Sequence, residues 1–203
     1  MKLYKTLSSA TNNIEEVRAL KLNIKSETFP SELLKLEHLE ELYLDGNCKE
    51  FPHNPGWRNL KVLSIKWPKF EGNFSDLFIL PALENLKIIE TPIKQFLLPL
   101  GEVGSPLKSL TMKDCGLEKL PEEISMLVHL KEMNLSGNNL AYLPYSFKEL
   151  SGLTRLNLDQ NLFSVFPEAL GSMPNLKHLS LDLNAFSEEE KSRIQRDHHI
   201  WIN

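Results

Sequence analysis

The side chains best able to do chemistry in this sequence are two cysteines and six histidines. A cysteine beside a histidine could act as a nucleophile, and a cluster of both at short spacing could hold zinc. The sequence contains neither an H-E-x-x-H nor a Cys-x-x-Cys spacing. The histidines are scattered, at His38, His53, His129, His178, His198 and His199. We therefore predict no catalytic residue, no metal site and no cofactor, so the protein is not expected to be an enzyme.

The elements that would have to position any functional residue form an internal repeat. The segment from Leu130 to Leu153 reads LKEMNLSGNNLAYLPYSFKELSGL, and it matches the segment that begins at Leu153 after a shift of 23 residues. Self-similarity at such a period is typical of a solenoid. Successive turns begin at Val17, Leu39, Leu60, Leu83, Leu107, Leu130, Leu153 and Leu176. The fold class predicted is an α/β solenoid of about eight repeats, with parallel strands on the concave face and short helices or arcs on the convex face.

The ninth position of each turn is predicted to face inward and to satisfy buried backbone groups. Asparagine fits this task because its amide both donates and accepts. The position is occupied by Asn47, Asn138, Asn161 and Asn184, with Thr91 and Cys115 as small substitutes. Lys25 and Pro68 are not suitable, so the sequence predicts that this ladder breaks at the first and third turns.

The return side of most turns starts with a Leu-Pro or Phe-Pro pair. Proline suits the first position of a short helical turn, where its missing N–H is not needed. We expect one-turn or two-turn helices, or irregular arcs, after Pro30, Pro52, Pro121, Pro144 and Pro167. The second to fourth turns depart from the repeat pattern. Two explanations stay open: tolerated drift of the sequence, or a local bulge that shapes a binding face.

Both ends of the array are predicted to be caps, so residues 1–203 form a single solenoid domain. Residues 1–16 offer Leu3, Leu7 and Ala10 as one helical face, and residues 17–184 carry the repeats. Residues 185–203 begin with a capping-box pattern, Ser187-x-x-Glu190, that opens a short charged helix. The alternating residues 199–202 are expected to add an edge strand.

The two cysteines are expected to be structural. Cys115 falls in the ladder column and Cys48 in an apolar slot of the shortened second turn. Three turns separate them, or about 15 Å of stacked strands. A disulfide needs Cα atoms within about 7 Å of each other, so the pair should not be bridged.

The repeat resembles the 23-residue leucine-rich repeat class whose return arm reads L-P-x-x-I/L-x-x-L-x-x-L. The lead-in YKTLSSATNNIEEVRALKL and the tail FSEEEKSRIQRDHHIWIN are similar to the ends of bacterial, leptospiral-type repeat proteins. This resemblance implies a horseshoe that binds host or other proteins through its inner surface. Eukaryotic arrays of similar period, some of which scaffold signalling, are the near alternative.

Composition limits the classes of partner. The formal charge of −4 gives no basic footprint for nucleic acid. The apolar runs are far shorter than the roughly 20 residues of a membrane span. We expect a monomer that binds a protein partner. The N-terminus lacks the apolar core of a signal peptide, so either the protein stays inside the cell or a leader precedes Met1, and localisation stays open.

Strand positions three, five and seven point away from the core and are free to define a partner. On consecutive turns they and the eighth position bring together three lysines, two aromatic residues and an isoleucine. An apolar cluster within a charged rim resembles an interface hot spot. The predicted partner-binding residues are Tyr43, Lys66, Trp67, Lys87, Ile89 and Lys113. The competing interpretation is that Trp67 folds onto the irregular third turn and the lysines are merely solvated.

Three functions follow from this pattern. The first is a protein-recognition module that acts on a host or neighbouring protein. The second is an intracellular scaffold, or a building block, of a signalling or structural complex. A carbohydrate or small-ligand binder is third, because the inner face offers just two aromatic residues.

Overall fold

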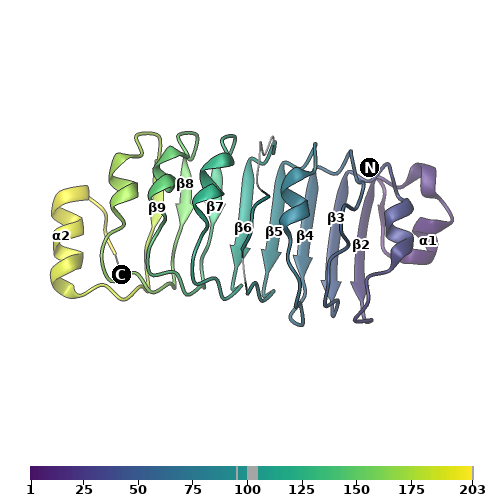
Figure 1. The fold of residues 1–203 in the computed structure, drawn as a ribbon, viewed down its shortest axis with the longest axis horizontal. Coiled ribbons are helices and arrows are strands. Elements are labelled where there is room, and N and C mark those ends of the chain that lie inside the picture. The colour runs from purple at the N-terminus through teal and green to yellow at the C-terminus, as the bar shows by residue number, and fades with distance from the viewer. Residues whose placement is uncertain (95, 100–104, 203) are drawn as a thin grey trace.

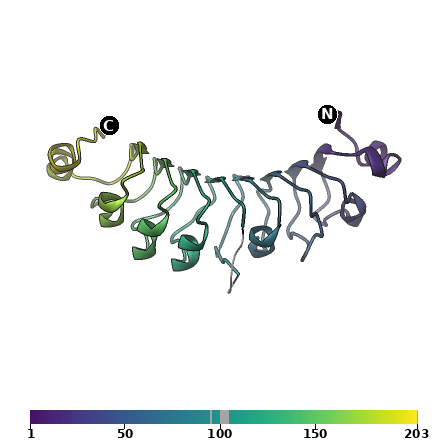
Figure 2. The ribbon, with the colours of Figure 1, turned by 90° about the horizontal axis from the view of Figure 1, so that it is seen from above.

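The computed structural model describes residues 1–94, 96–99 and 105–202. Within them one parallel sheet contains nine strands in chain order, as Figure 1 shows. The strands are β1 (Leu3–Tyr4), β2 (Ala19–Ile24), β3 (Glu41–Gly46), β4 (Val62–Lys66), β5 (Asn85–Ile89), β6 (Ser109–Lys113), β7 (Glu132–Asn134), β8 (Arg155–Asn157) and β9 (His178–Ser180). The sheet is open and curved, and the strands line the concave side while short helices lie on the convex side (Figure 2). The predicted α/β solenoid is confirmed.

The core follows from the strand register. Leu20 pairs with Leu42, which pairs with Leu63, and the same column continues through the array. Its members from β2 to β8 are at most 3% exposed. Because alternate residues of a strand point to opposite faces, burying this column leaves its neighbours free on the concave side.

A left-handed residue ends the strand side of most turns. The eighth position has a positive φ at Gly46, Glu90, Asp114, Gly137, Gln160 and Leu183. Gly46 has φ +132, and a Cβ there would lie 2.0 Å from the backbone oxygen of Ile24, so glycine is required at that point. This bend rotates the chain so that the next residue faces inward. We call these six positions the bend column.

The inward residues form the predicted ladder. Asn138 Oδ1 accepts from the backbone N–H of Cys115 and Leu117 at 3.1 and 3.0 Å. Its Nδ2 donates to the carbonyls of Met112 and Leu135 at 2.7 Å each. Asn161 and Asn184 repeat the arrangement, and Thr91 and Cys115 are buried in the same column. The ladder is confirmed at these positions, whereas Asn47 reaches only Lys25 O, at 3.5 Å.

The third turn departs from this pattern at Trp67. No left-handed φ occurs there, so the chain turns inward one residue early. The indole is fully buried, and the Trp67 N–H donates to Thr91 Oγ1 at 2.8 Å, as a ladder residue would. Pro68 is left exposed, as is Lys25 in the first turn. The predicted breaks in the ladder are therefore confirmed, but the prediction that Trp67 projects from the strand face is wrong.

The return segments are short 3-10 helices. They are η2 (Ser31–Lys35), η3 (Ser75–Ile79), η4 (Glu122–Met126), η5 (Tyr145–Glu149) and η6 (Glu168–Ser172). Pro30, Pro121, Pro144 and Pro167 occupy the N-cap, one residue before the predicted first helical position. The stretch after Pro52 forms no helix, and Trp57 fills the space there with no exposed surface. Part of the degenerate fourth turn, at residues 95 and 100–104, lies outside the described residues.

The N-terminal cap differs in detail from the prediction. Leu3 belongs to β1, which pairs with β2, rather than to a helix. The helix α1 (Leu7–Thr11) starts after Thr6, whose Oγ1 accepts from the N–H of Ser9 at 3.2 Å. A short turn, η1 (Ile14–Glu16), then leads into β2. Ala10 is fully buried as predicted.

The C-terminal cap is the helix α2 (Glu188–His198), which begins at Ser187 as predicted. Its Ile194 is fully buried, and Glu190 accepts from the Phe166 N–H at 2.9 Å. The predicted edge strand at 199–202 is wrong, because His199, left-handed at φ 57, ends α2 and the residues after it pair with no strand. Ile200 and Ile202 instead pack against the core from the end.

No helix in the described part of the chain is both long enough and apolar enough to cross a membrane.

Candidate functional site

Five of the six predicted binding residues lie on the concave face. They are Tyr43 on β3, Lys66 on β4, Lys87 and Ile89 on β5, and Lys113 on β6. Ile89 pairs directly with Lys113, and Asp45, two residues after Tyr43, pairs with Lys66. The structure thus brings these residues together on four adjacent strands. Trp67 is not among them, because it lies in the core within 6.4 Å, between ring centroids, of Phe51 and Phe74.

Acidic neighbours neutralise two of the three lysines. Lys66 Nζ lies 2.6 Å from Glu90 Oε1, and Lys113 Nζ lies 3.7 Å from Asp114 Oδ2. Lys87 forms no ion pair with any residue that the structure describes, and its side chain is exposed. Of the three predicted lysines, one therefore remains an uncompensated cation in the middle of the cluster.

Tyr43 sits at the edge of this cluster. Its hydroxyl donates to Glu41 Oε2 at 2.9 Å. Burial, followed by that hydrogen bond, raises the pKa of Tyr43, so the phenol stays protonated and oriented. Its ring is half-buried and still reaches the surface.

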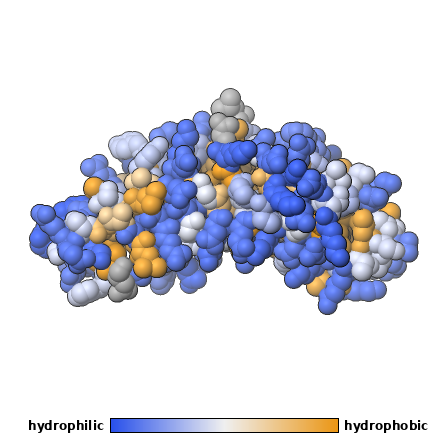
Figure 3. Space-filling view, turned by 90° about the horizontal axis from the view of Figure 1, so that it is seen from below, coloured by the Kyte–Doolittle hydropathy of each residue, from blue (hydrophilic) through white to orange (hydrophobic). Residues whose placement is uncertain are grey.

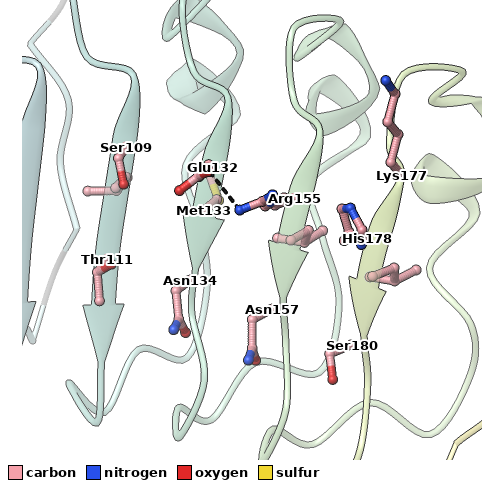
Figure 4. Close-up of a pocket in the computed structure, with 13 residues that line it drawn as sticks. Ser109, Thr111, Glu132, Met133, Asn134, Arg155, Asn157, Lys177, His178 and Ser180 are labelled. Atoms are coloured by element: carbon pink, nitrogen blue, oxygen red, sulfur yellow. Dashed lines mark hydrogen bonds and ion pairs between the residues drawn. The ribbon is translucent and has the colours of Figure 1, made fainter.

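A separate hollow of about 550 Å³ lies further along the same face, on β6 to β9. Figure 4 shows its polar side chains in two rows that cross the strands. Glu132, Arg155 and His178 form one row, and Thr111, Asn134, Asn157 and Ser180 form the other. We call these the charged row and the amide row.

The charged row contains one cross-strand ion pair. Arg155 Nη1 lies 3.3 Å from Glu132 Oε1, and both side chains are more than half exposed. Such a pair stabilises the fold by at most about 1 kcal/mol. The arginine is therefore available to a ligand.

The amide row is held in place by its own backbone. Asn134 Oδ1 accepts from the Ser136 N–H, and Asn157 Oδ1 accepts from the Asp159 N–H, at 2.9 Å in both cases. Because each oxygen is occupied by a donor, the amide orientation is fixed. Neither Nδ2 group donates to any described residue. Two oriented and unused donors thus stand on adjacent strands.

Sequence reasoning identified these positions as outward-facing but did not select them as a site. It favoured aromatic and lysine side chains, which lie on β3 to β6. A usable signal was present, because Asn-Leu-Ser-Gly-Asn at residue 134 and Asn-Leu-Asp-Gln-Asn at residue 157 repeat a surface asparagine in consecutive turns. In both turns this side chain accepts from the backbone N–H two residues later, which supports the bend and leaves its Nδ2 group on the surface.

The arrangement offers polar groups suited to binding. Burial raises the pKa of the Cys48 thiol to about 11 and that of Cys115 to about 12, so neither supplies a thiolate near neutral pH. Both thiols are free and buried. In the described part of the chain no three His, Cys, Asp or Glu side chains come together as metal ligands.

Known proteins of similar sequence and shape contain leucine-rich repeats. Residues 105–163, which include β6 to β8, match the leucine rich repeat family model. The Arabidopsis thaliana disease resistance protein RPP4 is 30% identical over 140 residues, which cover 63% of this chain but 12% of that protein. This chain therefore spans about one eighth of that relative.

Two solved structures show the same fold. A leucine-rich repeat protein of Leptospira interrogans aligns over 94% of this chain and 62% of its own, with a TM-score of 0.61 and 22% identity. An internalin of Listeria monocytogenes, inlF, aligns over 91% of this chain and 53% of its own, with a TM-score of 0.70 and 20% identity. The fold is the leucine-rich repeat horseshoe, which commonly serves as a protein-interaction module and is generally not enzymatic.

Proposed function

We propose that this protein is a non-enzymatic recognition module that binds a partner protein through its concave face. The observation that carries the proposal is that this face presents side chains the core does not need, on strands fixed by hydrogen bonds to both neighbours. Lys87 and the Nδ2 groups of Asn134 and Asn157 are the clearest examples, because these donors face outward without a described partner. The two asparagine amides are held by backbone N–H groups and therefore lose little entropy on binding.

On β3 to β6 the proposed contact residues are Tyr43, Lys66, Lys87, Ile89 and Lys113. Tyr43 and Ile89 supply partly buried apolar surface, and Lys87 supplies a charge that attracts an acidic partner. Lys66 and Lys113 contribute mainly their alkyl stems, since their ammonium groups are paired. Trp67 is excluded because it has no exposed surface.

The partner class rests on composition and resemblance. A formal charge of −4 disfavours nucleic acid. The similarity of both chain ends to leptospiral-type proteins supports a host or neighbouring protein as the target. We propose that the module acts as a monomer.

The experiment starts by capturing a partner on the immobilised full chain, identifying it, and measuring association kinetics with the purified partner. Lys87→Glu should slow association and change its salt dependence, because an uncompensated surface charge mainly steers encounter. Glu123→Ala, on η4 of the convex face, is the control and should bind normally. If the control loses affinity while Lys87→Glu does not, the binding surface lies on the outer arc and the proposal fails.

A further inference from the structure

We infer that the hollow on β6 to β9 seats an extended acidic segment of the partner protein, an inference that rests on the proposed concave-face function. The segment runs across the strands, its backbone carbonyls accept from the amide row, and one carboxylate reaches Arg155. This names the chemistry of the partner and a second contact region, separate from the cluster around Lys87.

The amide row determines what the partner must offer. The oxygens of Asn134 and Asn157 are held by backbone N–H groups, so only their Nδ2 donors remain available. A complementary ligand therefore supplies acceptors rather than donors. The Thr111 hydroxyl, in register with Asn134, can also donate.

The geometry favours an extended segment over a helix. A helix uses its carbonyls in its own hydrogen bonds, so it would cover the amide donors without satisfying them. An extended chain has free carbonyls along its length. Crossing from β6 to β9 takes three interstrand steps, or about 14 Å, which about four extended residues span.

The charged row accounts for the acidic character of the segment. Arg155 uses a single nitrogen, at 3.3 Å, to contact Glu132, and a guanidinium has five N–H donors that suit a second, bidentate carboxylate. Lys177 is exposed and pairs with no described residue. Figure 4 places it at the same end of β9 as His178, on the strand beside Arg155. The Lys177 side chain points away from Arg155 in Figure 4. Asp159 lies beside the amide row, where its Oδ1 accepts from the Ser180 hydroxyl. The carboxylate of the segment is therefore expected at the unused donors of Arg155 and not along the amide row.

The test selects ligands from a random dodecapeptide library displayed on phage, using the full chain as bait. Selected peptides are synthesised and titrated by fluorescence anisotropy. The variants are Arg155→Gln and the double variant Asn134→Asp with Asn157→Asp. Aspartate keeps the oxygen that accepts from the backbone, but it replaces the Nδ2 donors with a negative charge. The double variant is therefore also titrated with a peptide whose acidic residue is replaced by its amide, and binding of this neutral peptide should weaken as well. The matched control is Asn23→Asp, the same change on the concave face of β2.

The expected result is enrichment of Asp or Glu at one peptide position, with binding weakened at least tenfold in both variants and unchanged in the control. Peptides without acidic enrichment, or ones that bind both variants normally, would overturn the inference, as would a library that yields no binder. Peptides lost in Lys87→Glu but retained in Arg155→Gln would also overturn it, yet they would leave the concave-face function intact. Thermal melts of all variants separate lost binding from lost folding.

Discussion

Asn161 should support the fold far more than Asn157, although the two differ by four residues in sequence. Asn161 is 4% exposed, accepts from the Leu140 N–H at 3.0 Å and donates to the carbonyls of Leu135 and Leu158 at 3.0 Å each. Asn157 is half-exposed and makes one such bond, from the Asp159 N–H. One asparagine serves the interior and the other serves the surface.

The magnitude follows from what each alanine substitution leaves unpaired. The Leu135 and Leu158 carbonyls keep hydrogen-bond partners in Asn138 and Asn184. In Asn161→Ala, therefore, only the buried Leu140 N–H loses its hydrogen-bond partner. An unsatisfied buried donor costs about 1–3 kcal/mol, and the lost bonds add about 1 kcal/mol. We expect about 3 kcal/mol for Asn161→Ala. For Asn157→Ala we expect less than about 1 kcal/mol, because water can replace the bond to the half-exposed Asp159.

Urea unfolding followed by circular dichroism measures both effects. The midpoint should shift clearly more for Asn161→Ala at an unchanged m-value. For a chain of this size the difference of about 2 kcal/mol corresponds to roughly 4–8 °C in Tm. Equal midpoints for the two variants would refute the assignment of Asn161 to the ladder.

Three further predictions concern stability. Trp67→Ala should destabilise the fold by about 3–5 kcal/mol, as buried aromatic truncations do, and an unchanged melting temperature would contradict its placement in the core. Removal of residues 187–203 strips Ile194 and the Glu190 contact from the last turn and should cost several kcal/mol; an unaltered melt would show that α2 is not a cap. In the folded chain the pKa of Cys115 is raised from 9.0 to about 12. The neutral thiol therefore stabilises the fold fully below about pH 9, and above that pH the free energy of unfolding falls by up to about 1.4 kcal/mol per pH unit. The urea midpoint should therefore fall less between about pH 8 and pH 10 for Cys115→Ala than for the native chain. An equal fall in both proteins would show that ionisation of Cys115 is not the cause of the lost stability.

The repeat could be predicted from the sequence because the same structural requirements recur in every turn. Each strand buries alternate leucines, and each bend needs an inward amide, so period and ladder both show in the printed residues. The same logic predicted that Lys25 and Pro68 would break the ladder. The strands of the eight repeats and their order followed from the period, whereas β1 and the lack of a strand at 199–202 did not.

The prediction for Trp67 was wrong because the eighth position of a turn does not by itself determine the backbone conformation of the residue that occupies it. It occupies the eighth position, as do Gly46 and Asp114, and the step from Leu60 to Leu83 is the usual 23 residues. What differs is φ, which is left-handed in the bend column and not at Trp67. A bulky residue disfavours that region, but Leu183 adopts it at φ 58. Side-chain type alone was therefore an insufficient guide, and the buried cluster with Phe51 and Phe74 decided the outcome.

The bend column also sets the electrostatics of the concave face. Its backbone must be left-handed, but its side chains are not needed in the core and can vary. Glu90 and Asp114 occupy it beside β5 and β6, where they neutralise Lys66 and Lys113. Gly137, Gln160 and Leu183 occupy it beside β7 to β9 and carry no charge, so Arg155 is left with Glu132 alone. Replacing Glu90 with Gln would free Lys66 without touching a strand residue, which makes this column a route by which the array can change its partner while keeping its fold.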